Sequence, residues 1–181
     1  SDAVGITRES FAAGEEEAIR IIKTVAESQG LTTEMDAAAN LVVSLPGREA
    51  ETPFVACGSH LDSVPQGGNF DGAAGVIAGL ICLSRIKTDC VTPLKNVKLV
   101  VLRGEESAWY GKACVGSNAL FGMLTPEDLA SVHRKNATTL GDALRRAGAE
   151  VERIEKGETL LDPTSVAAFL ELHIEQGPVM V

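Results

Sequence analysis

The sequence predicts an α/β fold, a mostly parallel sheet with helices on both faces. Three observations support it: short β-type runs alternate with helical runs, polar residues collect directly after the β-type runs, and 45% of the 181 residues are apolar. A chain of this length is sufficient for one sizeable core. We therefore expect one domain, or a piece of one.

The elements expected before residue 58 are one helix and two strands. Apolar residues recur at helical spacing over 18–26, between acidic residues at 15–17 and a glycine stop at Gly30. Residues 40–45 and 53–57 are β-type runs joined by a polar loop with turn residues. The helix has the pattern of a packing helix, and we assign it no chemistry.

A long helix and a buried strand are expected next. Residues 72–86 form an almost uncharged run, rich in Gly and Ala at its start, which allows close approach to a neighbouring backbone. Residues 96–102 alternate and then become apolar, which is typical of a strand buried on at least one face. Glu105 and Glu106 follow this strand directly.

The last third of the chain predicts two short helices and a further strand. Residues 125–128 combine a capping threonine, a proline and two acids, which indicates a helix start. A helix over 140–147 is expected to stop at Gly148. Residues 166–174 form a strong β-type run that carries His173 near its end.

Composition narrows the range of partners. The formal net charge of −9, without any cluster of Lys or Arg, argues against nucleic acid and anionic lipid. No apolar run is long enough to span a bilayer, and the first residues do not resemble a signal peptide. We expect a cytoplasmic protein whose partner is a small-molecule substrate.

The four cysteines are far apart and form no C-x-x-C pair. They stand at Cys57, Cys82, Cys90 and Cys114. This spacing indicates neither a zinc ribbon nor a disulfide framework, and we expect reduced, mostly buried thiols.

Residues 58–72 carry the densest chemistry in the chain. They place His60, Asp62 and Asp71 in a loop between a strand and a helix, which is where open α/β sheets bind ligands. The carboxyl ends of parallel strands share one edge, so we expect Glu106 and His173 to converge on the same cleft. The glycines at 67–68 are either a flexible turn or a close approach of the backbone to the site.

Imidazole and carboxylate groups together suit zinc, manganese or cobalt. His60, Asp71 and His173 would bind one ion, and Asp71 could bridge to a second ion held by Glu106. Glu105, beside a ligand but free of metal, is the expected general base.

Asp62 lies two residues from His60, so in an extended segment it can orient the imidazole ring. Each of these residues also has a structural interpretation. His60 could be a hydrogen-bonded structural histidine, Asp62 a turn or cap, and Glu105 and Glu106 a solvated acidic loop.

Four motifs in order resemble the allantoate amidohydrolase and N-carbamoyl-L-amino-acid hydrolase group of the M20 metallopeptidase superfamily. They are Gly-Ser-His-Leu-Asp-Ser-Val-Pro at 58–65, Gly-Gly-Asn-Phe-Asp-Gly at 67–72, Glu105-Glu106 with Gly116-Ser117 downstream, and Glu-Leu-His-Ile-Glu-Gln-Gly-Pro at 171–178. The resemblance covers essentially the whole chain. It implies a zinc-exopeptidase-like catalytic domain.

The resemblance implies the same site as the residues do. His60 and His173 would bind one ion, Asp71 would bridge, Glu106 would bind the other ion, and Glu105 would be the base. The resemblance also implies that Gln176 contacts substrate, although it could instead be a polar turn residue. Residues 107–110 depart from the Arg-Phe pair usual after the two glutamates, a difference that bears on the substrate.

Residues 1–181 are expected to form only the N-terminal part of a di-metal catalytic domain. The family also has a lid domain through which the intact protein would form a homodimer, and a C-terminal return that supplies a further histidine and an arginine. Neither is found in this sequence. The 181 residues alone are therefore expected to be inactive.

The expected function is metal-dependent hydrolysis of a linear ureido or carbamoyl C–N bond in a small carboxylate-bearing compound, such as allantoate or an N-carbamoyl amino acid. Two divalent ions per intact subunit would be zinc, manganese or cobalt. One alternative is a peptidase or deacylase on the same scaffold. An alternative of another class is a non-catalytic metal-binding fragment.

Overall fold

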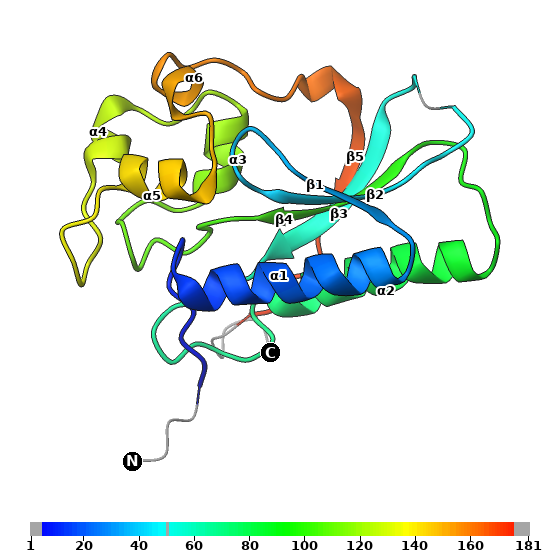
Figure 1. The fold of residues 1–181 in the computed structure, drawn as a ribbon, viewed down its shortest axis with the longest axis horizontal. Coiled ribbons are helices and arrows are strands. Elements are labelled where there is room, and N and C mark those ends of the chain that lie inside the picture. Colours follow the sequence, from blue (N-terminus) through cyan, green and yellow to red (C-terminus); the bar gives the residue numbers. More distant parts are fainter. Residues whose placement is uncertain (1–4, 50, 176–181) are drawn as a thin grey trace.

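The computed structural model describes residues 5–49 and 51–175. Within these residues five strands form one sheet in the order β1-β2-β4-β3-β5 (Figure 1). Their bounds are β1 Thr32–Met35, β2 Leu41–Leu45, β3 Phe54–His60, β4 Val97–Leu102 and β5 Val166–Leu170.

The sheet has a parallel half and an antiparallel half. β3 pairs in parallel with β4 on one side and with β5 on the other, which confirms that the strands containing Val55, Val100 and Phe169 lie side by side. β1 and β2 pair antiparallel with each other, and β2 pairs antiparallel with β4. The sheet is thus mixed, because the tight turn after β1 returns the chain directly as β2.

One face of the sheet is covered by two long helices, α1 (Ala13–Ser28) and α2 (Ala73–Thr88). They run side by side beneath the strands (Figure 1). Apolar side chains from both helices and from the strands fill the space between them, including Ile19, Ile22, Val43, Val76, Leu80, Leu99 and Val101. This core fixes the position of α2, and therefore of the loop that precedes it.

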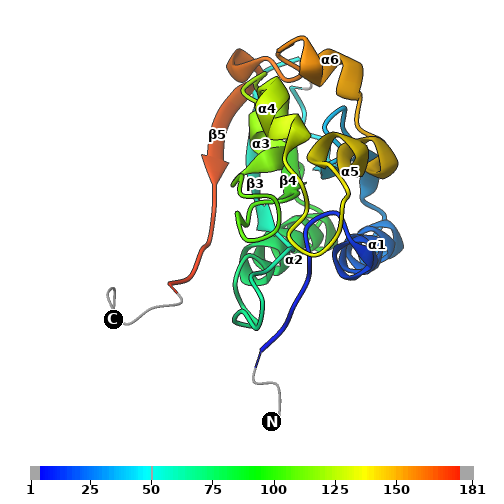
Figure 2. The same ribbon diagram turned by 90° about the vertical axis from the view of Figure 1, so that its left-hand side faces the viewer.

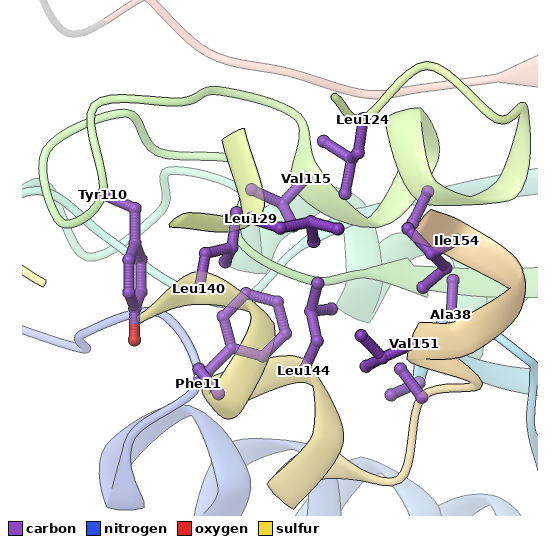
Figure 3. Close-up of a cluster of buried hydrophobic side chains, with 14 of the residues drawn as sticks. Phe11, Ala38, Tyr110, Val115, Leu124, Leu129, Leu140, Leu144, Val151 and Ile154 are labelled. Carbon is purple, nitrogen blue, oxygen red and sulfur yellow. The ribbon is translucent and has the colours of Figure 1, made fainter. Parts of the chain in front are cut away.

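The shorter helices gather on the other side of the sheet, where α3 contacts β4 (Figures 1 and 2). They are α3 Val115–Leu120, α4 Pro126–Ala130, α5 Leu140–Ala147 and α6 Val151–Glu155, followed by the 3₁₀ turn η1 Pro163–Ser165. A second apolar cluster holds these helices together, and it includes Phe11, Val115, Leu129, Leu140, Leu144 and Ile154 (Figure 3). The expectation of helices on both faces is confirmed.

Two strand boundaries differ from the prediction in ways that matter for the site. β3 continues to His60, so this histidine is the last residue of its strand. β5 ends at Leu170, and His173 lies beyond it in an irregular segment. β1, α3 and α6 were not predicted, because their short sequences carry little periodicity.

The cysteine prediction was half right. All four thiols are free, but Cys82, Cys90 and Cys114 are exposed and Cys57 is only half-buried. Cys82 lies on the outer side of α2, where an apolar sequence does not ensure burial. Among the described helices, none is long and apolar enough to cross a membrane.

Candidate metal and catalytic site

Three donor atoms from distant parts of the chain meet beyond the end of the parallel strands. His60 Nε2 lies 3.3 Å from His173 Nε2 and 3.8 Å from Asp71 Oδ1. His173 Nε2 lies 3.4 Å from the same Asp71 oxygen. His60 and Asp71 are buried and His173 is exposed. The three donor atoms therefore lie at the boundary between the protein interior and solvent.

The separations suit a small divalent cation. Zinc bonds of 2.0–2.2 Å in tetrahedral geometry place donor atoms about 3.3–3.6 Å apart. Two imidazole nitrogens and one carboxylate oxygen are ligands that zinc and similar metals accept. The residues present therefore fit a metal ion in chemistry and in spacing.

The ring of His60 is oriented so that Nε2 faces this group. His60 Nδ1 lies 2.9 Å from the main-chain carbonyl oxygen of Asp62 and 3.4 Å from its carboxylate. A proton on Nδ1 would donate to Asp62 and leave Nε2 as the free donor atom. Asp62 therefore contacts the His60 ring, as the i, i+2 spacing predicts. The shorter of the two contacts is with the main-chain carbonyl oxygen of Asp62, and the longer is with its carboxylate.

Charge around His60 is strongly negative. Burial alone would disfavour the imidazolium, but Asp62, Glu105 and Asp71 outweigh it and raise the pKa of His60 to about 9. In the metal-free protein the ring is therefore protonated at neutral pH. A bound cation would replace that proton.

Asp62 is a fully buried hub for the site. Its carboxylate accepts hydrogen bonds from the hydroxyl of Ser10 at 2.5 Å and from the backbone N–H groups of Glu105 and Glu106 at 3.1 and 3.0 Å. Burial disfavours its charged form, but hydrogen bonds with His60 and Ser10 hold the pKa of Asp62 below its usual value. Asp62 thus ties the β3 loop to the β4 loop.

Glu105 and Glu106 take different positions. Glu105 Oε2 lies 3.8 Å from His60 Nε2, and its other oxygen accepts from the Cys114 thiol at 3.7 Å. Glu106 accepts from the backbone N–H of Val64 at 3.2 Å and hydrogen-bonds with Asp71. His60, Glu105 and Glu106 form a second group with metal-ligand spacing.

The proximity of Asp71 changes the protonation of Glu106. Burial comes first and the Asp71 carboxylate second among the causes that raise the pKa of Glu106 to about 7. A proton shared between two carboxylates occupies a place where a cation would bind more strongly. This position agrees with the expected role of Glu106 beside a bridging Asp71.

A buried ion pair lies next to the loop that carries Glu105 and Glu106. Arg103, at the end of β4, donates from Nε and one terminal nitrogen to Glu15, at 3.0 and 2.7 Å. Glu15 also accepts the backbone N–H of Gly104 at 3.3 Å. The sequence predicts only a favourable charge at a helix start for Glu15. Its place on the apolar stripe with Ile19 and Ile22 is the signal that indicates burial.

Trp109 and Tyr110 belong to the core. The Trp109 indole N–H donates to the carbonyl of Ser63 at 2.8 Å, and its ring stacks on the buried His133. Tyr110 packs edge-on against the same histidine. Trp109 and Tyr110, in the segment that departs from the usual Arg-Phe pair, are therefore buried packing residues. Gln176, the expected substrate contact, lies outside the described residues.

The chain matches a family model and several known proteins. The model for peptidase family M28 matches residues 40–159, about two thirds of the chain. The chain belongs to peptidase family M28. This M28 chain is 35% identical over 176 residues to an N-carbamoyl-L-amino acid amidohydrolase of Geobacillus stearothermophilus, covering 97% of the chain and 42% of that relative.

Two further comparisons point to the same group. An allantoate amidohydrolase of Escherichia coli is 33% identical to the M28 chain, with 84% of the chain and 36% of the relative covered. A hydantoinase/carbamoylase family amidase from Burkholderia ambifaria has a similar structure, with a TM-score of 0.83 at 31% identity, covering 99% of the chain and 42% of that protein. The resemblance to amidohydrolases and carbamoylases is thereby confirmed.

The M28 chain spans well under half the length of these relatives.

Proposed function

We propose that this chain carries most of the catalytic site of a metal-dependent amidohydrolase that cleaves a linear ureido or carbamoyl C–N bond. The observation that carries the proposal is the meeting of His60 Nε2, Asp71 Oδ1 and His173 Nε2 at 3.3–3.8 Å, with Glu105 beside them. The type of bond is inferred from the relatives, which are named as N-carbamoyl-L-amino acid and allantoate amidohydrolases.

His60, Asp71 and His173 would hold one divalent ion, and Asp71 with Glu106 would hold a second. Zinc, manganese and cobalt all suit these donors. Such ions polarise a carbonyl oxygen and lower the pKa of water. Asp71 lies within reach of both groups, because it contacts His173 at 3.4 Å and hydrogen-bonds with Glu106.

Glu105 would act as the proton carrier. Its carboxylate faces His60 and is partly exposed, so water and substrate can reach it. In the proposed reaction it takes a proton from the attacking water and gives it to the leaving nitrogen as the C–N bond breaks. Asp62 would hold the backbone of Glu105 and the ring of His60 in one arrangement.

The 181 residues would be part of a larger catalytic unit and inactive alone. The share of the relatives that they cover, 36–42%, supports this proposal. Gln176 as a substrate contact, a homodimer formed through a lid domain, and a cytoplasmic location remain proposals from the sequence.

Hydrolysis assays on the full-length protein test the function. N-carbamoyl-L-amino acids and allantoate should release ammonia only in the metal-loaded protein, and a dipeptide should remain intact. A peptidase is the second candidate, because the matching family model is that of a peptidase family. Dipeptide cleavage without ammonia release would support the peptidase and contradict our proposal.

A further inference from the structure

His173 lies beyond the part of β5 that the sheet holds. The pairing of β5 with β3 reaches Cys57 and Leu170, whereas β3 continues to His60. Leu172 and His173 follow with largely exposed side chains. Sheet hydrogen bonds therefore do not explain why the imidazole of His173 stays 3.3 Å from that of His60.

A side-chain hydrogen bond connects the two strands at this level. The hydroxyl of Ser59, next to His60 and buried, donates to Glu171 Oε1 at 2.7 Å. Glu171 stands two residues before His173, and the bond joins positions 112 residues apart. The bond thus joins the residue next to His60 to a residue two positions before His173.

The backbone of the same segment is packed closely against α2. A Cβ atom at Gly75 would clash with the carbonyl oxygen of Leu172 and with the side chain of Ser59. Glycine at this position lets the helix, the serine and the segment meet at one point. The contact is therefore part of a packed arrangement.

We propose that Ser59 and Glu171 are positioning residues, whose hydrogen bond holds His173 against His60 for metal binding. The inference rests on the proposed metal site. It adds two residues, Ser59 and Glu171, that would not bind the metal themselves. Hydrogen bonds behind metal ligands typically account for about 10–100-fold in metal affinity.

Titration of the metal-free chain with Co²⁺, followed by visible absorption, measures both affinity and ligand geometry. Ser59→Ala and Glu171→Ala should each weaken binding by about 10–100-fold and alter the spectrum. The double variant should be no weaker than the poorer single one, because both remove the same contact. Glu171→Gln retains the acceptor oxygen and should restore the wild-type spectrum.

Ser44→Ala, on β2, is the matched control and should bind as wild type. Circular dichroism checks folding, and Glu171→Ala decides the outcome if Ser59→Ala does not fold, since Glu171 lies on an exposed segment. Wild-type affinity and spectrum in Glu171→Ala would overturn the inference while leaving the metal site intact. Absence of Co²⁺ binding in the wild type would instead overturn the metal site and this inference together.

Discussion

Asp62 accepts the backbone N–H of Glu106 at 3.0 Å, which links the loop after β3 to the loop after β4. The same carboxylate accepts the hydroxyl of Ser10 and lies beside the ring of His60. The proposed metal ligands and the proposed base therefore depend on one buried aspartate.

Asp62→Asn should weaken both metal binding and folding. The amide cannot accept all the donors that surround the carboxylate, so we expect about 10–100-fold lower Zn²⁺ affinity and a loss of about 1–3 kcal/mol in the free energy of unfolding. Zn²⁺ titration and urea denaturation measure these effects. Ser10→Ala, which removes one donor only, should have a smaller effect; an Asp62→Asn variant with wild-type affinity would exclude the hub role.

The stability of the metal-free protein should fall as pH rises from about 6.5 to 9. The pKa of His60 is about 9 in the folded state and about 6.5 in an unfolded chain. The folded state thus binds the proton more tightly, and this contribution is present below pH 6.5 and lost by pH 9. Urea denaturation with chelator at several pH values measures it.

His60→Asn is the control for this pH effect, because it removes the titrating ring. Its stability should change less over the same pH range. An equal change over pH 6.5–9 in the chelated wild type and in the variant would contradict the raised pKa of His60.

Glu105→Gln should make the Cys114 thiol more reactive. Burial and the Glu105 carboxylate together raise the pKa of this thiol, and only the thiolate is alkylated readily. Removal of the charge should therefore increase the rate of alkylation at Cys114 at pH 8. Mass spectrometry after iodoacetamide treatment measures each cysteine separately.

Cys82 is the internal control, because it lies on α2 and is also exposed. Its alkylation rate should be the same in both proteins. Equal rates at Cys114 in wild type and variant would contradict the contact between the thiol and Glu105.

The isolated 181 residues should bind one divalent ion firmly and hydrolyse no ureido or carbamoyl substrate. His60, Asp71 and His173 supply three ligands to one ion, whereas the expected second ion would use the shared Asp71 and Glu106. Elemental analysis after dialysis and an ammonia assay check both statements. Full activity of the isolated chain would show that no further segment is needed.

The sequence was most informative where polar residues follow apolar strands. The end of β4 was predictable because its mostly apolar run stops before Arg103. The end of β3 was predicted three residues early, at Cys57, because Gly58 and Ser59 interrupt the apolar run. The parallel arrangement then brings distant side chains together. The site residues could be named on this basis, with the motif resemblance in agreement.

Tertiary contacts explain what the sequence did not predict. α3 begins after Cys114, which has a left-handed backbone conformation, and Gly116 fits against Asn40 and Arg103. The Ser59–Glu171 bond spans 112 residues. Local propensity contains no information about contacts between residues so far apart in the chain. Helix α3 and the Ser59–Glu171 bond near His173 could therefore not be predicted from the sequence.

The most direct test of the central claim is the turnover of an N-carbamoyl-L-amino acid by metal-loaded full-length protein carrying Glu105→Gln. We expect nearly unchanged metal content and a kcat lower by about 10²–10⁴-fold, because the substitution removes only the proton carrier. Glu106→Gln, measured in parallel, should lose metal. Unchanged turnover in Glu105→Gln with metal retained would exclude Glu105 as the proton carrier.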